Sequence, residues 1–104
     1  PIWWPIINKD ILGRVVYSKA GRDRSRMFII VGMVNDDFVL LADGELRKIE
    51  NPKVKNIKHI HYTNMTADKV LEHLSRGEMP GNHVIRKNLK VLLEARETKG
   101  KEVW

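Results

Sequence analysis

The sequence predicts a mainly β fold with an α-helical C-terminal part: a small five-stranded barrel followed by two helices. Up to about residue 62, short runs of β-branched and apolar residues alternate with turn signals at close spacing. From residue 63 onward, the apolar residues follow a helical period instead. Short strands packed this densely favour a strongly bent barrel, because a flat open sheet would expose too much unpaired edge.

The expected strands are short and separated by turns. The first covers residues 11–18, where Val15 and Val16 favour extended backbone. The runs at 27–34 and 38–42 flank a polar turn and are expected to pair as a hairpin. Asp43 and Gly44 predict a tight turn with Gly44 at positive φ, which places the fourth strand at 45–49 and the fifth at 57–62. The side chains expected in the core are Ile29, Val31, Leu40, Ile49 and Ile57.

Two helices are expected after the barrel. The first lies near residues 66–76, with Thr66 as its N-cap and Gly77 just beyond its last turn. The second lies near residues 82–97 and begins with Asn82 as its N-cap. The buried face of the first helix is formed by residues at helical spacing: Ala67, Val70, Leu71 and Leu74.

The chain is therefore expected to divide into an apolar N-terminal arm at residues 1–10, a barrel at 11–62 and a two-helix extension at 63–104. Trp3 and Trp4 in the arm are expected to cover an open end of the barrel or the helices. Apolar runs are far shorter than the roughly 20 residues that span a membrane, and no signal peptide is recognisable. A cytoplasmic protein without a membrane partner is expected.

Composition narrows the class of function. The 104 residues carry 19 Lys and Arg against 13 Asp and Glu, for a formal net charge of +6, and they include no Cys. The absence of Cys excludes disulfides, thiolate catalysis and Cys-based zinc or iron–sulfur sites. A basic balance favours polyanionic partners, above all nucleic acid.

No catalytic or cofactor site is expected, because the sequence has no nucleophile elbow, phosphate-binding loop or dinucleotide fingerprint. His59 and His61 would share one face of a strand, which suggests a metal pair. Two ligands without a third at a motif spacing are weak evidence, and a polar strand face is the preferred interpretation. The paired Asp36 and Asp37 are similarly better explained as turn residues.

Two basic segments give a stronger signal. Arg22, Arg24 and Arg26 alternate, so in extended backbone their guanidinium groups would point the same way and suit phosphate oxygens. A solvated loop explains the same spacing equally well. Residues 51–56 form an extended basic segment stiffened by Pro52, with Asn56 able to contact a base or a phosphate. The residues expected to bind RNA are Lys19, Arg22, Arg24, Arg26, Arg47, Lys48, Lys53, Lys55, Asn56, Lys58 and His59.

Three segments in order resemble a known family: GRVVYSKAGRDRSRMFIIV at 13–31, DFVLLADG at 37–44 and NIKHI at 56–60. The first looks like a KOW motif. The order resembles the fourteen-e family of large-subunit ribosomal proteins, and more closely the short KOW-domain RNA-binding proteins of Firmicutes. The resemblance covers about residues 11–62. It implies an SH3-like barrel whose KOW loop, at 19–26, and second basic segment, at 53–59, contact RNA. Ser25 stands where relatives usually have a second Gly.

The preferred hypothesis is a non-enzymatic, ribosome-associated RNA-binding protein that acts in translation, with ribosomal RNA or the ribosome as partner and no cofactor or metal. Backbone contacts would recognise the shape of RNA more than its sequence. Among the aromatic residues that could stack on bases, Phe28 and Phe38 are expected in the core instead, while for Tyr17 both the core and base stacking are left open. The alternative is a protein-interaction module that binds a peptide through the barrel or the helices, because this fold type does not fix function.

Overall fold

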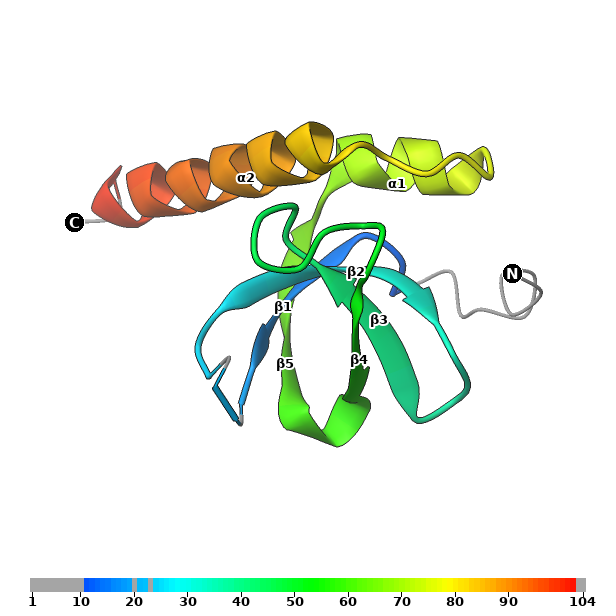
Figure 1. Cartoon of the computed structure of the whole chain (residues 1–104). Helices are drawn as coiled ribbons and strands as arrows, with labels where there is room; N and C mark the ends of the chain where they lie inside the picture. The colour runs from blue at the N-terminus through cyan, green and yellow to red at the C-terminus, as the bar shows by residue number, and fades with distance from the viewer. Residues whose placement is uncertain (1–10, 20, 23, 103–104) are drawn as a thin grey trace.

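The computed structural model describes residues 11–102 apart from Ala20 and Asp23, and the side chains only up to residue 95. The expected arm at 1–10, with Trp3 and Trp4, therefore lies outside the described residues. The strands are β1 (Arg14–Ser18), β2 (Met27–Met33), β3 (Phe38–Ala42), β4 (Lys53–Asn56) and β5 (Ile60–Thr66). A 3₁₀ turn, η2 (Ile57–His59), joins β4 to β5, and the helices α1 (Asp68–Ser75) and α2 (Asn82–Glu102) follow (Figure 1).

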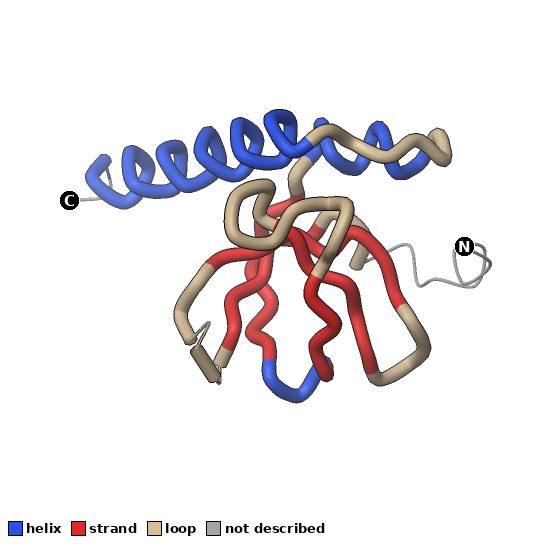
Figure 2. The backbone as a smooth tube through the Cα atoms, viewed as in Figure 1, coloured by secondary structure: helices blue, strands red, loops and turns tan. Residues whose placement is uncertain are grey.

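The strands form one antiparallel sheet in the order β4-β3-β2-β1-β5. Its two edge strands, β4 and β5, are joined through η2 alone. The four Cα–Cα steps from Asn56 to Ile60 span at most about 15 Å, whereas the edges of a flat five-stranded sheet lie about 19 Å apart. The sheet must therefore curl, as the bent strands of Figure 2 show. Register shifts between Ile30 and Gly32 and between Arg14 and Val16 contribute to the bend.

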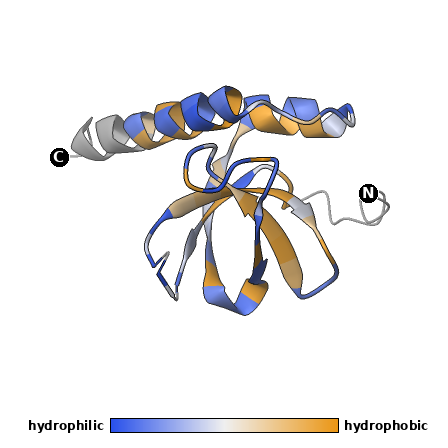
Figure 3. Ribbon diagram, in the orientation of Figure 1, coloured by the Kyte–Doolittle hydropathy of each residue, from blue (hydrophilic) through white to orange (hydrophobic). Residues whose placement is uncertain are grey.

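The core lies inside the curled sheet and continues beneath the helices. Phe28, Ile29 and Leu41 are fully buried in the sheet. Val70 and Leu74 of α1 and Ile85 of α2 join the same cluster, so the helices cover one side of the sheet. Figure 3 shows hydrophobic residues along β2 and β3, and hydrophilic residues in the loops at the opposite side from the helices.

Most of the expected elements form, but the fourth strand is wrong. Residues 45–49 are a loop, and the strand is β4, which pairs with β3 from Leu41↔Lys53 to Phe38↔Asn56. The fifth strand also starts later than expected, because Ile57–His59 is a 3₁₀ turn, and it continues to Thr66. Ile29, Val31 and Ile49 are buried as expected, whereas Leu40 and Ile57 are half-buried against the core. Phe28 is buried, but Phe38 is 37% exposed, so its assignment to the core is wrong.

The loop at 43–52 is folded around the buried carboxylate of Asp43. Its Oδ1 atom accepts hydrogen bonds from the backbone N–H groups of Glu45 and Arg47, at 2.9 and 2.8 Å. Gly44 has the expected positive φ of 79°. Because Asp43 satisfies these amides, residues 45–49 do not pair with β3 as a strand.

Side-chain amides of α2 hold the neighbouring elements. The Oδ1 atom of Asn82 accepts from the backbone N–H of Ile49, and its Nδ2 atom donates to the Glu50 carboxylate. This hydrogen bond holds the pKa of Glu50 below its ordinary value. Asn82 thus anchors the 43–52 loop instead of capping its own helix.

The free backbone N–H groups at the N-terminus of α1 find their hydrogen-bond acceptor in the other helix. Its N-cap is Ala67, which has no side-chain acceptor, and the expected cap Thr66 belongs to β5. The Oδ1 atom of Asn88 in α2 instead accepts from the backbone N–H groups of Lys69 and Val70. At the other end, Gly77 has φ 74°, as a residue just beyond a helix C-terminus commonly does. The second helix runs to Glu102, five residues beyond its expected end. No helix within the described residues is both long and apolar enough to cross a membrane.

Candidate nucleic-acid interface

The β1–β2 loop and the β4–β5 connection lie side by side. The backbone N–H of Lys19 donates to the carbonyl of His59, with an N···O distance of 2.8 Å. A Cβ atom built on Gly21 would lie 3.8 Å from Nζ of Lys55. The structure therefore brings together the two basic segments that the sequence analysis selected. We call this surface the basic edge: Lys19, Arg22, Arg24, Lys55, Lys58 and His59.

The β1–β2 loop is a compact turn and not an extended segment. Its backbone closes through a hydrogen bond from Arg24 N–H to the Gly21 carbonyl, at 3.3 Å, and Ser25 has φ 70°. The argument that alternate arginines point the same way in extended backbone is therefore wrong here. The side chains of Arg22 and Arg24 are nevertheless exposed, as is Lys19.

Arg26 has a structural partner. Its Nη2 atom lies 3.6 Å from the Oδ2 atom of Asp43, whose side chain is only 6% exposed. Arg26 thus compensates a buried carboxylate that already organises the 43–52 loop. The guanidinium turns toward the side of the molecule formed by Asp43 and α2, where both residues line a shallow groove.

Arg47 and Lys48 belong to the 43–52 loop, which packs against the start of α2. Asn82 binds the backbone of Ile49, and Nη1 of Arg86 donates to the Gly44 carbonyl at 2.6 Å. Figure 1 shows this loop beneath the helices and the η2 turn at the opposite side of the sheet. The structure therefore does not bring Arg47 and Lys48 together with the lysine of η2.

The second basic segment is divided between β4 and η2. Lys53 and Lys55 are half-buried on β4, while Lys58 and His59 are exposed in η2. The Oδ1 atom of Asn56 accepts from Lys58 N–H at 3.0 Å and caps the turn. The amide that was expected to contact RNA thus also shapes the turn that presents Lys58.

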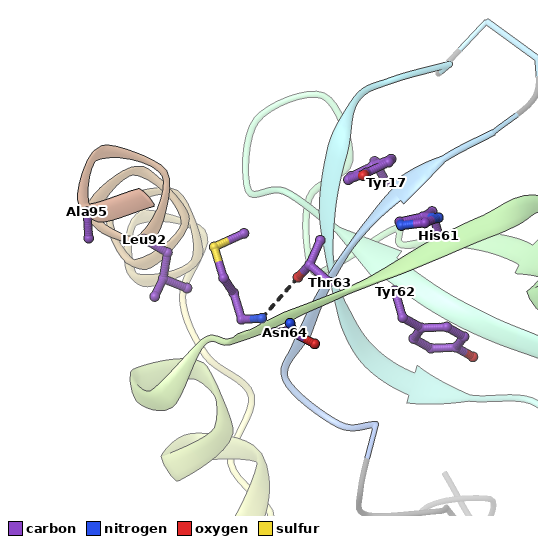
Figure 4. A pocket seen from close by; sticks show the side chains of 8 residues that line it. Tyr17, His61, Tyr62, Thr63, Asn64, Leu92 and Ala95 are labelled. Carbon is purple, nitrogen blue, oxygen red and sulfur yellow. Dashed lines mark hydrogen bonds between the residues drawn. The ribbon is translucent and has the colours of Figure 1, made fainter. Parts of the chain in front are cut away.

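An aromatic pair lies on the strands that lead to the basic edge. The rings of Tyr17 in β1 and His61 in β5 are stacked, with centroids 4.8 Å apart and planes within 16°. They border an open groove of about 630 Å³ that reaches α2 (Figure 4). The groove is lined by Tyr17, His61, Tyr62, Thr63, Asn64, Met65, Leu92 and Ala95.

The expected pairing of His59 and His61 on one strand face is wrong. His59 lies in η2, and only His61 is in β5, where its ring stacks on Tyr17. Within the part of the chain that the structure describes, no three His, Cys, Asp or Glu side chains come together as a possible metal site.

Part of the chain is similar to a known bacterial protein. Over 50 residues, the chain is 34% identical to a Bacillus subtilis (strain 168) protein named "Putative ribosome-binding protein YbzG". The match covers 48% of this chain and 68% of the relative. The chain belongs to the YbzG family. No protein-family model matches the chain.

His61 of this YbzG-family chain was not among the residues predicted from the sequence to bind RNA. Its signal was the spacing: Tyr17 and His61 each stand two residues from a member of the basic edge, Lys19 and His59 respectively. The contact between the two rings could not be predicted from these spacings alone. It depends on β1 pairing with β5 in the register that places Tyr17 opposite His61.

Proposed function

We propose that this protein is a non-enzymatic, ribosome-binding protein that grips structured ribosomal RNA through the basic edge. It acts in the cytoplasm in translation and needs no cofactor. The name of its Bacillus relative supports the ribosome as partner. The observation that carries the RNA site is the hydrogen bond from Lys19 to His59, which brings two basic segments from distant parts of the chain onto one surface.

The proposal includes an SH3-like barrel of the KOW type as the scaffold. The strand order β4-β3-β2-β1-β5, the short η2 link between the edge strands and the register shifts are consistent with that architecture. Such a scaffold holds the β1–β2 loop and the η2 turn between paired strands, so that the cations are positioned before RNA arrives. Preorganisation lowers the entropy that binding costs.

The chemistry of the basic edge suits the sugar-phosphate backbone. Arg22 and Arg24 present planar guanidinium groups that match phosphate oxygens bidentately. Lys19 and Lys58 supply compact charges on exposed side chains. Contacts of this kind fix the position of the protein on folded RNA and carry little sequence information. Arg26, Arg47 and Lys48 lie toward α2 and are assigned a secondary role at most.

Ribosome binding tests the proposal directly. Purified Bacillus subtilis ribosomal subunits are mixed with the full chain and sedimented through sucrose, and the bound protein is measured. We expect co-sedimentation of the natural sequence and at least about tenfold weaker binding for the Arg22→Ala, Arg24→Ala double variant. Crosslinking in cells followed by sequencing of the attached RNA should enrich ribosomal RNA.

A matched control removes the same charge elsewhere. Lys69 and Arg76 lie on and after α1, are exposed and pair with Glu72 and Glu78. The Lys69→Ala, Arg76→Ala variant should keep ribosome binding, because exposed ion pairs add little to stability and because Figure 1 shows α1 on the opposite side of the sheet from the β4–β5 connection. Equal losses in both double variants would show diffuse attraction to a basic protein. If ribosome binding is unchanged both in the Arg22→Ala, Arg24→Ala variant and at higher salt concentration, the result would favour a peptide-binding module.

A further inference from the structure

The Tyr17–His61 pair is placed where an RNA strand on the basic edge would bring its bases. In the β1–β5 ladder, Tyr17 pairs with His61, Ser18 pairs with Ile60, and the next step is the hydrogen bond from Lys19 to His59. Two residues of extended strand rise about 6.6 Å. The stacked rings and the first cations of the basic edge are thus immediate neighbours.

Burial shows that the rings and the cation share one face. Ser18 and Ile60 are only 2% and 3% exposed, so this rung points into the core. Side chains alternate along a strand, which places Tyr17 and Lys19 together on the outer face. Lys19 and His61 are exposed, in agreement with this alternation.

The groove beside the rings has a mixed lining of aromatic, polar and apolar side chains. Figure 4 shows Tyr17, His61 and Thr63 on one side of β5 and Tyr62 on the other. Leu92 and Ala95 of α2 also line this groove. The Thr63 hydroxyl donates to the Val15 carbonyl at 2.6 Å, which ties this side chain to β1. A polar peptide would gain little from this groove, whereas a base extends an existing stack.

We propose that the Tyr17–His61 pair is a stacking platform for one unpaired base of the RNA whose backbone lies on the basic edge. This inference rests on the proposed function and adds a preference for RNA with an unpaired nucleotide. Aromatic stacking is tolerant of base identity, because every base has a π face. The platform would therefore select a bulge, loop or end, and not a sequence. Phosphates on Lys19 and the arginines would direct the nucleotide toward the rings.

The test compares two RNA hairpins that differ at one nucleotide. In one, 2-aminopurine is a single-nucleotide bulge; in the other it is paired with uracil. We expect the full chain to bind the bulged hairpin more tightly and to change its 2-aminopurine fluorescence on binding. His61→Ala should weaken binding to the bulged hairpin by about 5- to 150-fold, while binding to the paired hairpin is unchanged.

His61→Phe is the matched control, because it keeps a flat ring and removes the imidazole nitrogens. Retained bulge preference in this variant, with loss in His61→Ala, supports stacking; loss in both would assign the contact to the nitrogens and overturn the platform. Melting curves establish that each variant is folded. Equal binding of both hairpins by the natural sequence would overturn the platform and leave the phosphate contacts in place.

Two other outcomes identify different partners. If the natural sequence binds neither hairpin, and also fails to bind ribosomal subunits, both the platform and the proposed function are wrong. If His61→Ala binds both hairpins normally but no longer binds intact subunits, the groove takes a segment of a ribosomal protein. That result would overturn the platform while preserving ribosome binding.

Discussion

Gly44 combines a left-handed backbone with a close approach of α2. Its φ is 79°, and an added Cβ atom would meet the Asn82 carbonyl oxygen and lie 2.9 Å from Cγ of Arg86. The Gly44→Ala variant should lose about 2–5 kcal/mol of unfolding free energy, from backbone strain and from displacement of α2. Urea denaturation measures it. Gly77→Ala is the control, because Gly77 has φ 74° and nothing within 4 Å of an added Cβ, so it should lose only about 1–2 kcal/mol. Equal losses would show that α2 is not tightly held there.

Ser25 adopts a left-handed backbone conformation that is usually found at glycine. Its φ of 70° is the conformation that costs a residue with a Cβ atom about 1–2 kcal/mol. Ser25→Gly should therefore raise the melting temperature, with a net gain of roughly 1 kcal/mol or less after the added entropy of an unfolded glycine. RNA affinity should change little, since the loop backbone is kept. A lower melting temperature would contradict this account.

Single residues with one dominant constraint were the most predictable. The sequence was sufficient for the positive φ of Gly44, although the tight turn between two strands that was predicted there is a wider loop. It was also sufficient for Gly77, because a helix ends there. It was insufficient for Asn82 and Asn88. The side chain of Asn82 binds a backbone N–H group 33 positions away in the chain, and that of Asn88 binds one 19 positions away. A local rule assigns an asparagine to its own helix, and only packing shows which other segment it serves.

At the scale of elements, Asn88 connects the two helices. Its side chain satisfies two amides of α1 that Ala67 leaves without a cap. Asn88→Ala should destabilise the fold by about 0.5–2 kcal/mol, as loss of an N-cap does. Hydrogen exchange should accelerate specifically at the amides of Lys69 and Val70. Lys87→Ala, which changes the preceding exposed residue of α2, should leave both measurements unchanged. Uniform acceleration across α1 and the sheet would instead indicate global destabilisation.

The misplaced fourth strand has a physical cause. Residues 45–49 follow a turn dipeptide and end in the buried Ile49, which resembles a short strand in the sequence. The Asp43 carboxylate accepts hydrogen bonds from the backbone N–H groups of Glu45 and Arg47, so these groups have partners without pairing to another strand. The strand that does pair contains two lysines and an exposed Val54, at 53%. A polar edge strand has almost no hydrophobic signal, and its position follows from the partner strand β3.

At the scale of the whole molecule, strand order decides which cations act together. The sequence identified two basic segments, but not that Lys19 meets His59 while Arg26 pairs with Asp43. Neither contact follows from local spacing, because each joins residues at least 17 positions apart across the curled sheet. The sequence therefore predicts the two segments of the candidate site. Which of their residues lie together on one surface follows only from the fold.

The number of cations that touch RNA together determines how binding responds to salt. Each phosphate neutralised by the basic edge releases counterions, so the logarithm of affinity should fall linearly with the logarithm of salt concentration. The Arg22→Ala, Arg24→Ala variant should reduce that slope by about one to two units for structured RNA and weaken binding similarly across sequences. Titrations of a paired hairpin between about 50 and 200 mM salt measure it. The Lys69→Ala, Arg76→Ala variant carries the same net charge and should keep the full slope. If both variants lose the same slope, the attraction belongs to the net charge of the molecule, and the pairing of the β1–β2 loop with η2 has no special role in RNA binding.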